Sequence, residues 1–380
     1  MQSTTIKRIA VSVFFFIYGF NLANLSSRLP ELKKVYGISD SKLGVILLCI
    51  AVGNMTIATF LSKKHLPFER KTILLMAIVV GSGMMMLAPI INGDWLTFPL
   101  FFIYGMTDGA KDIIMNEQAV VLESQYKKPL MSSFHAIGTM GLFVGASTGL
   151  EFVHLGLDLF HHFAIIALLC LVILLVGIPY LFMHSKTISQ EVDTTTPSLS
   201  WSKISLLLGG IAFCAMLGDS AMNDWAGIYT EQVLKAGATS ATLAYTIFIS
   251  GVTLGRLLGD RLRAKFGNYS LLFWNTIVTL IGLSTLILAT QLQTALLGFF
   301  MTGLGISTIV PLVYSIAGHW VSTNPSVSIA KISQLGYAAY FAAPLVIGFL
   351  GDIGSLRWGF GFVLCCSIGM IVLIRQLKTV

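Results

Sequence analysis

The sequence predicts an all-α membrane protein with 12 transmembrane helices arranged in two six-helix halves. Of its 380 residues, 55% are hydrophobic and only 11% are charged, against roughly 25% charged residues in a soluble protein. Apolar stretches of about 20 residues follow one another along the chain, each long enough to cross a hydrocarbon core of about 30 Å. Because lipid offers the backbone no hydrogen-bond partner, these stretches are expected to be helices.

Short polar connections separate the predicted helices, which are expected at residues 8–28, 41–61, 72–92, 96–121, 131–152, 161–183, 202–225, 240–259, 269–290, 294–317, 328–350 and 356–374. The longest polar stretch, residues 185–201, falls between the sixth and seventh of them. We therefore expect an N-terminal half over 1–184, a cytoplasmic linker over 185–201 and a C-terminal half over 202–380. This organisation is typical of duplicated transporters.

Basic residues are distributed unevenly between the two sides of the predicted membrane. With the N-terminus on the cytoplasmic side, most of the 24 Lys and Arg residues fall in inner loops and ends. This bias follows the positive-inside rule and predicts that both termini are cytoplasmic. The net charge of +7 thus reflects membrane orientation, and we expect no nucleic-acid partner.

All five cysteines fall inside apolar stretches, and their spacing fits neither a metal site nor a disulfide framework. We expect no metal and no cofactor. The first apolar stretch is followed by no cleavage-site pattern, so we interpret it as a retained first helix.

The predicted helix 96–121 carries the densest polar content of the chain. Asp108, Lys111, Asp112 and Asn116 share one face of it, whereas Glu117 points the other way. An acid at mid-membrane costs roughly 2.5–3.5 kcal/mol, so two acids on one helix need compensation, and Lys111 can supply it. One interpretation is a structural Asp108–Lys111 ion pair. The other is a desolvated carboxylate that exchanges a proton near neutral pH, a role that we assign to Asp112 with Asn116 as orienting donor.

The predicted helix 202–225 offers a second polar set. Asp219 and Asn223 lie one turn apart on one face, and Asp219 joins Asp108, Lys111 and Asp112 as a proton-coupling candidate. Asp224 is rotated away from them and lies nearer the outer surface. It either lines the cavity, is solvated, or caps a neighbouring helix.

Further candidates for a substrate cavity are polar residues on other predicted helices. They are Asn21, Asn24 and Arg28 in 8–28, and Gln334 and Tyr337 in 328–350, together with Asn116, Asn223 and Asp224. Pro30 follows the first helix directly and is expected to end it. His135 opens another helix, where it is either a hydrogen-bonded helix-start residue or a proton relay.

A polar segment after the predicted helix 240–259 carries a family resemblance. Residues 255–267, GRLLGDRLRAKFG, resemble the cytoplasmic loop signature of the major facilitator superfamily, G-x-x-x-D-R-x-G-R-[RK]. The resemblance implies the major facilitator fold and an inner gate closed by Asp260 and its basic neighbours. The implied gating residues are Gly255, Arg256, Gly259, Asp260 and Arg261. In the first half Phe60 stands opposite Asp260, and Glu69 is the candidate substitute.

Three further stretches resemble the fucose-permease-like branch of this superfamily and its bacterial inner-membrane relatives. They are Asp112–Asn116 with Met131–His135, Asp219–Trp225, and Gly303–Pro311 with Leu335–Tyr337. In the sugar permeases an acid on the fourth helix, with Asn one turn on, is implicated in proton coupling, and Asp112 and Asn116 match it. Fucose permease itself carries an acid where this chain has Ser26, so fucose is not implied as the substrate.

These observations predict a proton-coupled symporter that moves a small polar, sugar-like solute across the bacterial inner membrane by alternating access. Its partners would be that solute, protons and membrane lipid, and we expect a monomer. The acids Asp108, Asp112 and Asp219 leave open an antiporter that exports lipophilic cations. From a different class, a membrane-embedded enzyme using His135 would need a nucleophile or metal constellation, and none has suitable spacing. A transport-inactive sensor is the remaining alternative.

Overall fold

Helices account for every regular element in the residues that the structure describes. The structure is a computed structural model, and it describes residues 2–61, 68–91, 94–126, 130–181, 202–320 and 325–377. Contacts between Cα atoms divide the chain into two compact units, unit 1 from Met1 to Ile188 and unit 2 from Ser189 to Val380. The predicted linker 185–201 lies outside the described residues.

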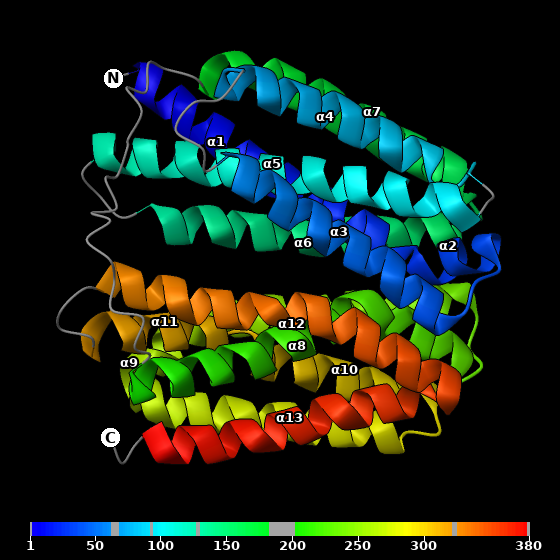
Figure 1. Cartoon of the computed structure of the whole chain (residues 1–380), viewed down its shortest axis with the longest axis vertical. Coiled ribbons are helices and arrows are strands. Elements are labelled where there is room, and N and C mark those ends of the chain that lie inside the picture. The colour runs from blue at the N-terminus through cyan, green and yellow to red at the C-terminus, as the bar shows by residue number, and fades with distance from the viewer. Residues whose placement is uncertain are drawn as a thin grey trace. The chain divides into compact units, whose positions relative to one another are not determined.

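The described helices of unit 1 are α1 (Gln2–Ser27), α2 (Leu29–Tyr36), α3 (Asp40–Leu61), α4 (Arg70–Leu87), α5 (Asp94–Tyr126), α6 (Met131–His154) and α7 (Leu159–Leu181) (Figure 1). Helix α1 packs against α6, α7 and α5, and α3 packs against α5. The sequence did not predict the short helix α2. It forms because Pro30 fits the first turn of a helix, and Gly37, with φ of 60°, ends it.

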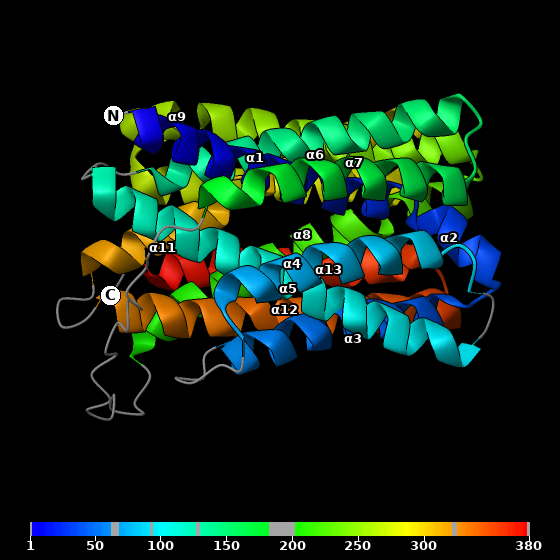
Figure 2. The ribbon, with the colours of Figure 1, turned by 90° about the horizontal axis from the view of Figure 1, so that it is seen from above.

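The described helices of unit 2 are α8 (Lys203–Gln232), α9 (Ala238–Leu288), α10 (Leu292–Ile306), α11 (Ile309–Trp320), α12 (Pro325–Ile353) and α13 (Leu356–Leu377). Within each unit the long helices run roughly along a common direction (Figure 2). Helix α9 holds two predicted spans, divided at Gly267, where φ is 76°. Conversely, α10 and α11 together form one predicted span.

The prediction of an all-α protein with many membrane-spanning helices is confirmed. Ten helical segments among the described residues are long and apolar enough to cross a membrane, with α9 counted once. Helix α5 is not among them, because Asp108, Lys111 and Asp112 interrupt its apolar stretch. Counting α5 once and α9 twice gives the 12 spans predicted from the sequence.

The break between α10 and α11 has an identifiable cause in the sequence. Pro311 has no N–H, so the carbonyl of Ser307, four residues earlier, loses its helical donor. The Ser307 N–H still donates to the Gly303 carbonyl at 3.1 Å, and the helix resumes with the Leu312 N–H on the Thr308 carbonyl at 3.0 Å. The interruption therefore leaves a backbone carbonyl available near the middle of a membrane span.

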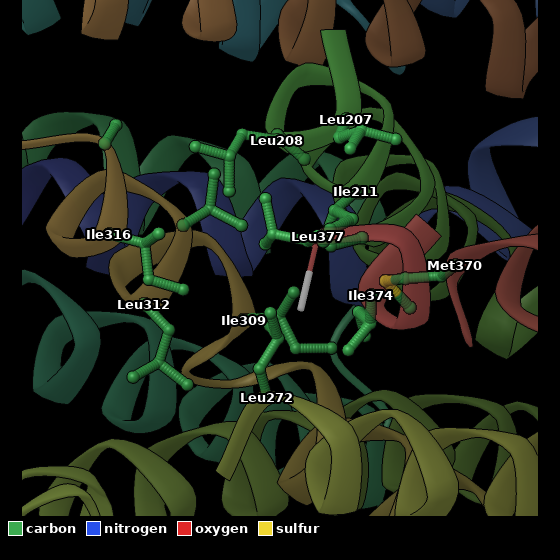
Figure 3. Close-up of a cluster of buried hydrophobic side chains, with 14 of the residues drawn as sticks. Leu207, Leu208, Ile211, Leu272, Ile309, Leu312, Ile316, Met370, Ile374 and Leu377 are labelled. Carbon is green, nitrogen blue, oxygen red and sulfur yellow. The ribbon is translucent and has the colours of Figure 1, made fainter. Parts of the chain in front are cut away.

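A hydrophobic cluster in unit 2 fixes α11 on the far side of this break. Leu207, Leu208 and Ile211 of α8 meet Ile309, Leu312 and Ile316 of α11, with Leu272 of α9 and Met370, Ile374 and Leu377 of α13 (Figure 3). Between membrane helices such side chains contribute through van der Waals packing and not through the hydrophobic effect, because lipid tails are as apolar as leucine. The cluster therefore packs α11 against α8, α9 and α13, whereas α10 packs mainly against α9.

Glycines bring α9 and α10 into close contact on the near side of the break. A Cβ added at Gly251 would lie 2.3 Å from the Phe300 carbonyl oxygen, and one at Gly303 would lie 2.2 Å from that of Phe248. A Cβ at Gly255 would lie 2.1 Å from the Ser307 hydroxyl. Small residues allow backbones to approach closely in membranes, so these glycines hold α10 against α9.

Gly251→Ala is expected to lower the unfolding free energy by about 1–3 kcal/mol, because the added methyl overpacks the α9–α10 contact. The matched control is Gly361→Ala in α13, where an added Cβ meets no atom within 4 Å. Thermal unfolding of both purified variants in detergent measures the difference. Equal midpoints for the two variants would show that this contact does not constrain the fold.

Candidate functional site

Asp112 and Asn116 lie one turn apart on α5, as the sequence predicts. The Asn116 amide nitrogen donates to the Asp112 carboxylate at 3.0 Å and to the Asp112 backbone carbonyl at 2.9 Å. Both residues are half-buried and lie near the middle of the helix. Asp112 therefore has a neutral side chain as its hydrogen-bond partner.

Asp108 lies one turn away in a different environment. Its carboxylate lies 3.5 Å from the Lys111 ammonium and accepts a hydrogen bond from the Tyr18 hydroxyl at 3.1 Å. The Lys111 ammonium also lies over the ring of Tyr104, 5.7 Å from its centroid. The two acids thus differ: Asp108 contacts a cation and a hydroxyl donor, whereas Asp112 is bound by an amide. No pattern in the sequence predicted the contacts of Tyr18 and Tyr104.

A small internal cavity of unit 1 lies beside Lys111. Tyr18 and Asn21 of α1, Ser82 of α4 and Cys170 of α7 line it, together with Lys111 and apolar side chains. Asn21, Asn24 and Arg28 were the candidates on the first helix. Of these three, Asn21 is among the residues that line this cavity.

Glu117 points away from Asp112 and forms an ion pair. Its carboxylate lies 3.0 Å from the Arg70 guanidinium, which also donates to the carbonyl of Leu61 at 2.9 Å. This cation joins the end of α3, the start of α4 and the α5 helix. Glu69, the predicted substitute for the missing gating Asp, is exposed beside it, and residues 62–67 of that loop lie outside the described residues.

Asn24 is fully enclosed in unit 1. Its amide donates to the Phe20 carbonyl at 2.8 Å, and its carbonyl oxygen lies 2.8 Å from Nε2 of the buried His162. The polar pattern of the first helix predicted Asn24 in a substrate cavity. The structure instead places it in the packing between α1 and α7, because the facing helix supplies a polar partner that the sequence pattern of α1 does not reveal.

Arg28, which was also predicted to line a substrate cavity, is enclosed, with 2% of its side chain exposed. Its guanidinium lies 2.8 Å from the Glu31 carboxylate and donates to the Leu157 carbonyl at 2.7 Å. Burial lowers the pKa of Arg28, and Glu31 opposes that effect. Nearby, hydrogen bonds from His161 hold the pKa of the exposed Asp158 below its usual value. Arg28 therefore joins the α1–α2 junction to the α6–α7 turn.

The second polar set lies on α8 in unit 2. The Asn223 amide donates to the Asp219 backbone carbonyl at 2.8 Å, and the Ser220 hydroxyl donates to the Asp224 carboxylate at 3.1 Å. Asp219 and Asp224 are both half-buried. Asp224 is therefore hydrogen-bonded within its own helix.

All five predicted gating residues lie within α9, because the helix continues past its predicted end at 259 to Gly267. Gly255 and Gly259 face Ser307 and Thr308 at the α10–α11 break. Asp260 and Arg261 are exposed on the next turn. The polar residues at 260–267 suggested a loop. Instead, α9 stays helical there, and it packs against the α10–α11 span at Gly255 and Gly259.

Arg256 differs from the other residues of that segment. It is exposed, and its Nε lies 3.5 Å from the Ser307 carbonyl that Pro311 leaves without a helical donor. The sequence did not predict this contact, although Pro311, four residues after Ser307, is a signal for the free carbonyl.

Gln334 and Tyr337 lie on α12, and both are exposed. The ring of Tyr337 is 54% exposed and stacks on that of Tyr340, with centroids 6.1 Å apart. Both predicted cavity residues are therefore accessible on the surface of α12. Among the described residues, no group of three or more His, Cys, Asp or Glu side chains could hold a metal ion.

Curated proteins similar to this chain come from bacteria and align over nearly its whole length. An uncharacterized MFS-type transporter of Yersinia pestis is 27% identical and covers 94% of this chain and 92% of its own length. The membrane protein MosC of Rhizobium meliloti is 27% identical over 96% and 88%. The uncharacterized transporter y4wD of Sinorhizobium fredii (strain NBRC 101917 / NGR234) is 25% identical over 97% of both chains. No family model matches the sequence.

Solved structures with the same fold include a mutant form of the nucleoside transporter NupG. Its TM-score is 0.74 at 11% identity, and 99% of each chain is covered. A bacterial homologue of the human lysosomal transporter Spinster, in an inward-facing and occupied conformation, gives a TM-score of 0.71 at 11% identity over 98% of this chain and 96% of its own. The helical fold and these relatives define a bacterial membrane transporter and not an enzyme. Its sequence is thus similar to that of an MFS-type transporter over nearly its whole length, and its fold is that of solved transporters.

Proposed function

We propose that this chain is a proton-coupled symporter for a small polar solute, and that Asp112 carries the coupling proton. The observation that supports this assignment is the contrast between the two acids of α5. Asp108 is compensated by the Lys111 cation and by the Tyr18 hydroxyl, whereas the Asp112 carboxylate is bound by the neutral Asn116 amide. Losing a proton therefore leaves a less compensated charge at Asp112 than at Asp108.

Proton binding at Asp112 would change the conformational equilibrium of the transporter. A charged carboxylate at mid-membrane favours the conformation that gives it water, and a protonated one tolerates enclosure. Protonation shifts the balance between two conformations only if Asp112 binds its proton more tightly in one conformation than in the other. Alternating access supplies those two states, with the solute exposed to one side of the membrane at a time.

The solute class is supported by neutral polar side chains within helices of both units. Asn21 and Asn116 in unit 1, and Asn223, Gln334 and Tyr337 in unit 2, offer hydrogen bonds suited to hydroxyl groups. The structural neighbour NupG is described as a nucleoside transporter, which extends the class from sugars and polyols to nucleosides. We place the chain in the bacterial inner membrane as a monomer with both termini cytoplasmic.

A second candidate is an antiporter that exports lipophilic cations. The three acids Asp112, Asp219 and Asp224, each half-buried on a membrane helix, are the observation that favours it. Such a carrier would bind an organic cation and protons in competition. The two candidates therefore differ in the charge of the ligand that binds.

Ligand-induced thermal stabilisation of the purified chain in detergent separates the candidates. Sugars, polyols, nucleosides and lipophilic cations would be compared at an acidic and a neutral pH. A ligand at ten times its dissociation constant stabilises by about 1.4 kcal/mol, which is measurable. Stabilisation by a hydroxyl-rich solute supports the symporter, and stabilisation by lipophilic cations alone would transfer the assignment to the antiporter.

A further inference from the structure

The ammonium group of Lys111 has more hydrogen-bond donors than partners in unit 1. A lysine ammonium carries three N–H donors and no acceptor. The Lys111 nitrogen lies 3.5 Å from the Asp108 carboxylate and 5.7 Å from the centroid of the Tyr104 ring. A charge-assisted hydrogen bond would measure about 2.7–2.9 Å, so neither of these contacts with described residues is one. Because only 12% of its side chain is exposed, the ammonium group needs a further hydrogen-bond partner inside unit 1.

Two further polar side chains lie at the same small cavity of unit 1. Lys111 of α5, Asn21 of α1 and Ser82 of α4 all line it. Neither the Asn21 amide nor the Ser82 hydroxyl forms a hydrogen bond with any of the described residues. The Tyr18 hydroxyl also lines the cavity, but it already donates to Asp108 at 3.1 Å. Three different helices thus bring polar groups without protein partners to one space inside the unit.

The size and the charge of the cavity restrict what it holds. The space open to the centre of a water molecule is about 20 Å³. One bound water needs roughly 10–15 Å³ and two to four polar partners, and the cavity meets both conditions. Since Lys111 and Asp108 compensate each other, a neutral occupant leaves the charge balanced, whereas an anion would add a charge inside the membrane. A single water molecule therefore fits both criteria.

We propose that this cavity is a binding site for one water molecule, which accepts a hydrogen bond from the Lys111 ammonium and is held by Asn21 and Ser82. Water both donates and accepts hydrogen bonds, so one molecule satisfies the ammonium, the amide and the hydroxyl together. The bound water stabilises the charged form of Lys111 beside Asp108, although the two side chains share no direct hydrogen bond. The inference concerns unit 1 by itself, and it depends neither on the transported solute nor on the proton at Asp112.

Substitution of the two neutral partners distinguishes a hydrated cavity from a dry one by the sign of the effect. In a hydrated cavity, Ser82→Ala and Asn21→Leu each remove a hydrogen bond to water, so the midpoint of thermal unfolding should fall. In a dry cavity, each removes an unpaired polar group from the membrane interior, so the midpoint should rise. The control is Ser147→Ala in α6, whose hydroxyl donates to the Phe143 carbonyl of its own helix at 2.9 Å, and we expect little change there. A rise in both cavity variants would overturn the proposal.

Bound water is detected directly by brief X-ray irradiation of the purified full chain in detergent, because hydroxyl radicals formed from a bound water oxidise the side chains beside it. Met115 and Cys170 line the cavity, and both are buried. We expect both to be oxidised in the unmodified chain. Met85 of α4 and Met370 of α13 are equally buried but are not among the lining residues, so they should not be oxidised. Peptide mass spectrometry measures the four sites, and equal protection of all four would overturn the proposal.

Two further comparisons identify the partners and the occupant. Ser82→Ala should lower the oxidation of Met115 by about twofold or more, because the water loses one of its partners. Unchanged oxidation in both Ser82→Ala and Asn21→Leu would overturn the assignment of these partners. Replacement of chloride by gluconate at constant ionic strength should leave the unfolding midpoint of the unmodified chain unchanged. A midpoint that depends on chloride in the unmodified chain, but not in Lys111→Met, would show that the cavity holds a halide in place of water.

Discussion

Asp112→Asn is expected to abolish accumulation of solute driven by a pH gradient while leaving exchange of solute across the membrane largely intact. The amide keeps the size and polarity of the side chain but cannot gain or lose a proton, so solute binding and conformational exchange no longer depend on pH. The hydrogen bond that Asn116 donates at 3.0 Å can still be accepted by the new side-chain oxygen. The measurement is uptake of a solute found by thermal stabilisation, in proteoliposomes with and without a pH gradient, beside counterflow with solute on both sides.

The matched control is Asp108→Asn on the same helix. Asp108 is paired with Lys111 at 3.5 Å and bonded to Tyr18, so its substitution should lower stability while the folded fraction keeps pH-driven accumulation. Normal accumulation by Asp112→Asn would contradict the assignment of the coupling proton. Loss of accumulation in Asp108→Asn alone would transfer that role to Asp108.

Lys111→Met is expected to lower the unfolding free energy by about 3–5 kcal/mol, because it leaves the Asp108 carboxylate without its cation in the interior of unit 1. The exposed fractions are 12% for the Lys111 side chain and 8% for that of Asp108, so water screens the pair little. Methionine retains most of the length of the lysine side chain, which limits any additional loss of packing. Thermal and denaturant unfolding in detergent, followed by tryptophan fluorescence, measure the change.

A second substitution separates the charge effect from packing. Asp108→Asn combined with Lys111→Met removes both charges, and replacing a whole buried pair by neutral groups is often nearly neutral in stability. The double variant should therefore be more stable than Lys111→Met alone. A loss of less than about 1 kcal/mol in the single variant would place the pair in the range of exposed salt bridges.

Helix positions were predictable because the bilayer imposes them. The predicted span 41–61 corresponds to Asp40–Leu61, and 131–152 corresponds to Met131–His154. Hydrophobic length and the need to satisfy the backbone internally decide such boundaries, and both are properties of the local sequence. The polar segment 255–267 is an exception. Its polar residues predicted that the helix ends at 259, but α9 continues to Gly267 while it packs against the α10–α11 span.

Partners across helices were not predictable in the same way. The sequence placed Asp112 and Asn116 on one face, because both lie on one helix at a spacing of four residues. Tyr18 reaches Asp108 from 90 residues away, and His162 reaches Asn24 from 138 residues away. No periodicity within a single helix contains that information.

The sequence by itself determined the class of fold, the number of spans and the presence of acids in the middle of α5 and α8. These follow from composition and from spacing along one helix. Only the tertiary structure decided which acid is compensated, that Asn24 and Arg28 are enclosed, and that Arg256 meets the free carbonyl of Ser307. The physical reason is that a charge in a membrane is compensated by whichever helix packs beside it, and helix packing joins residues that are distant in the chain.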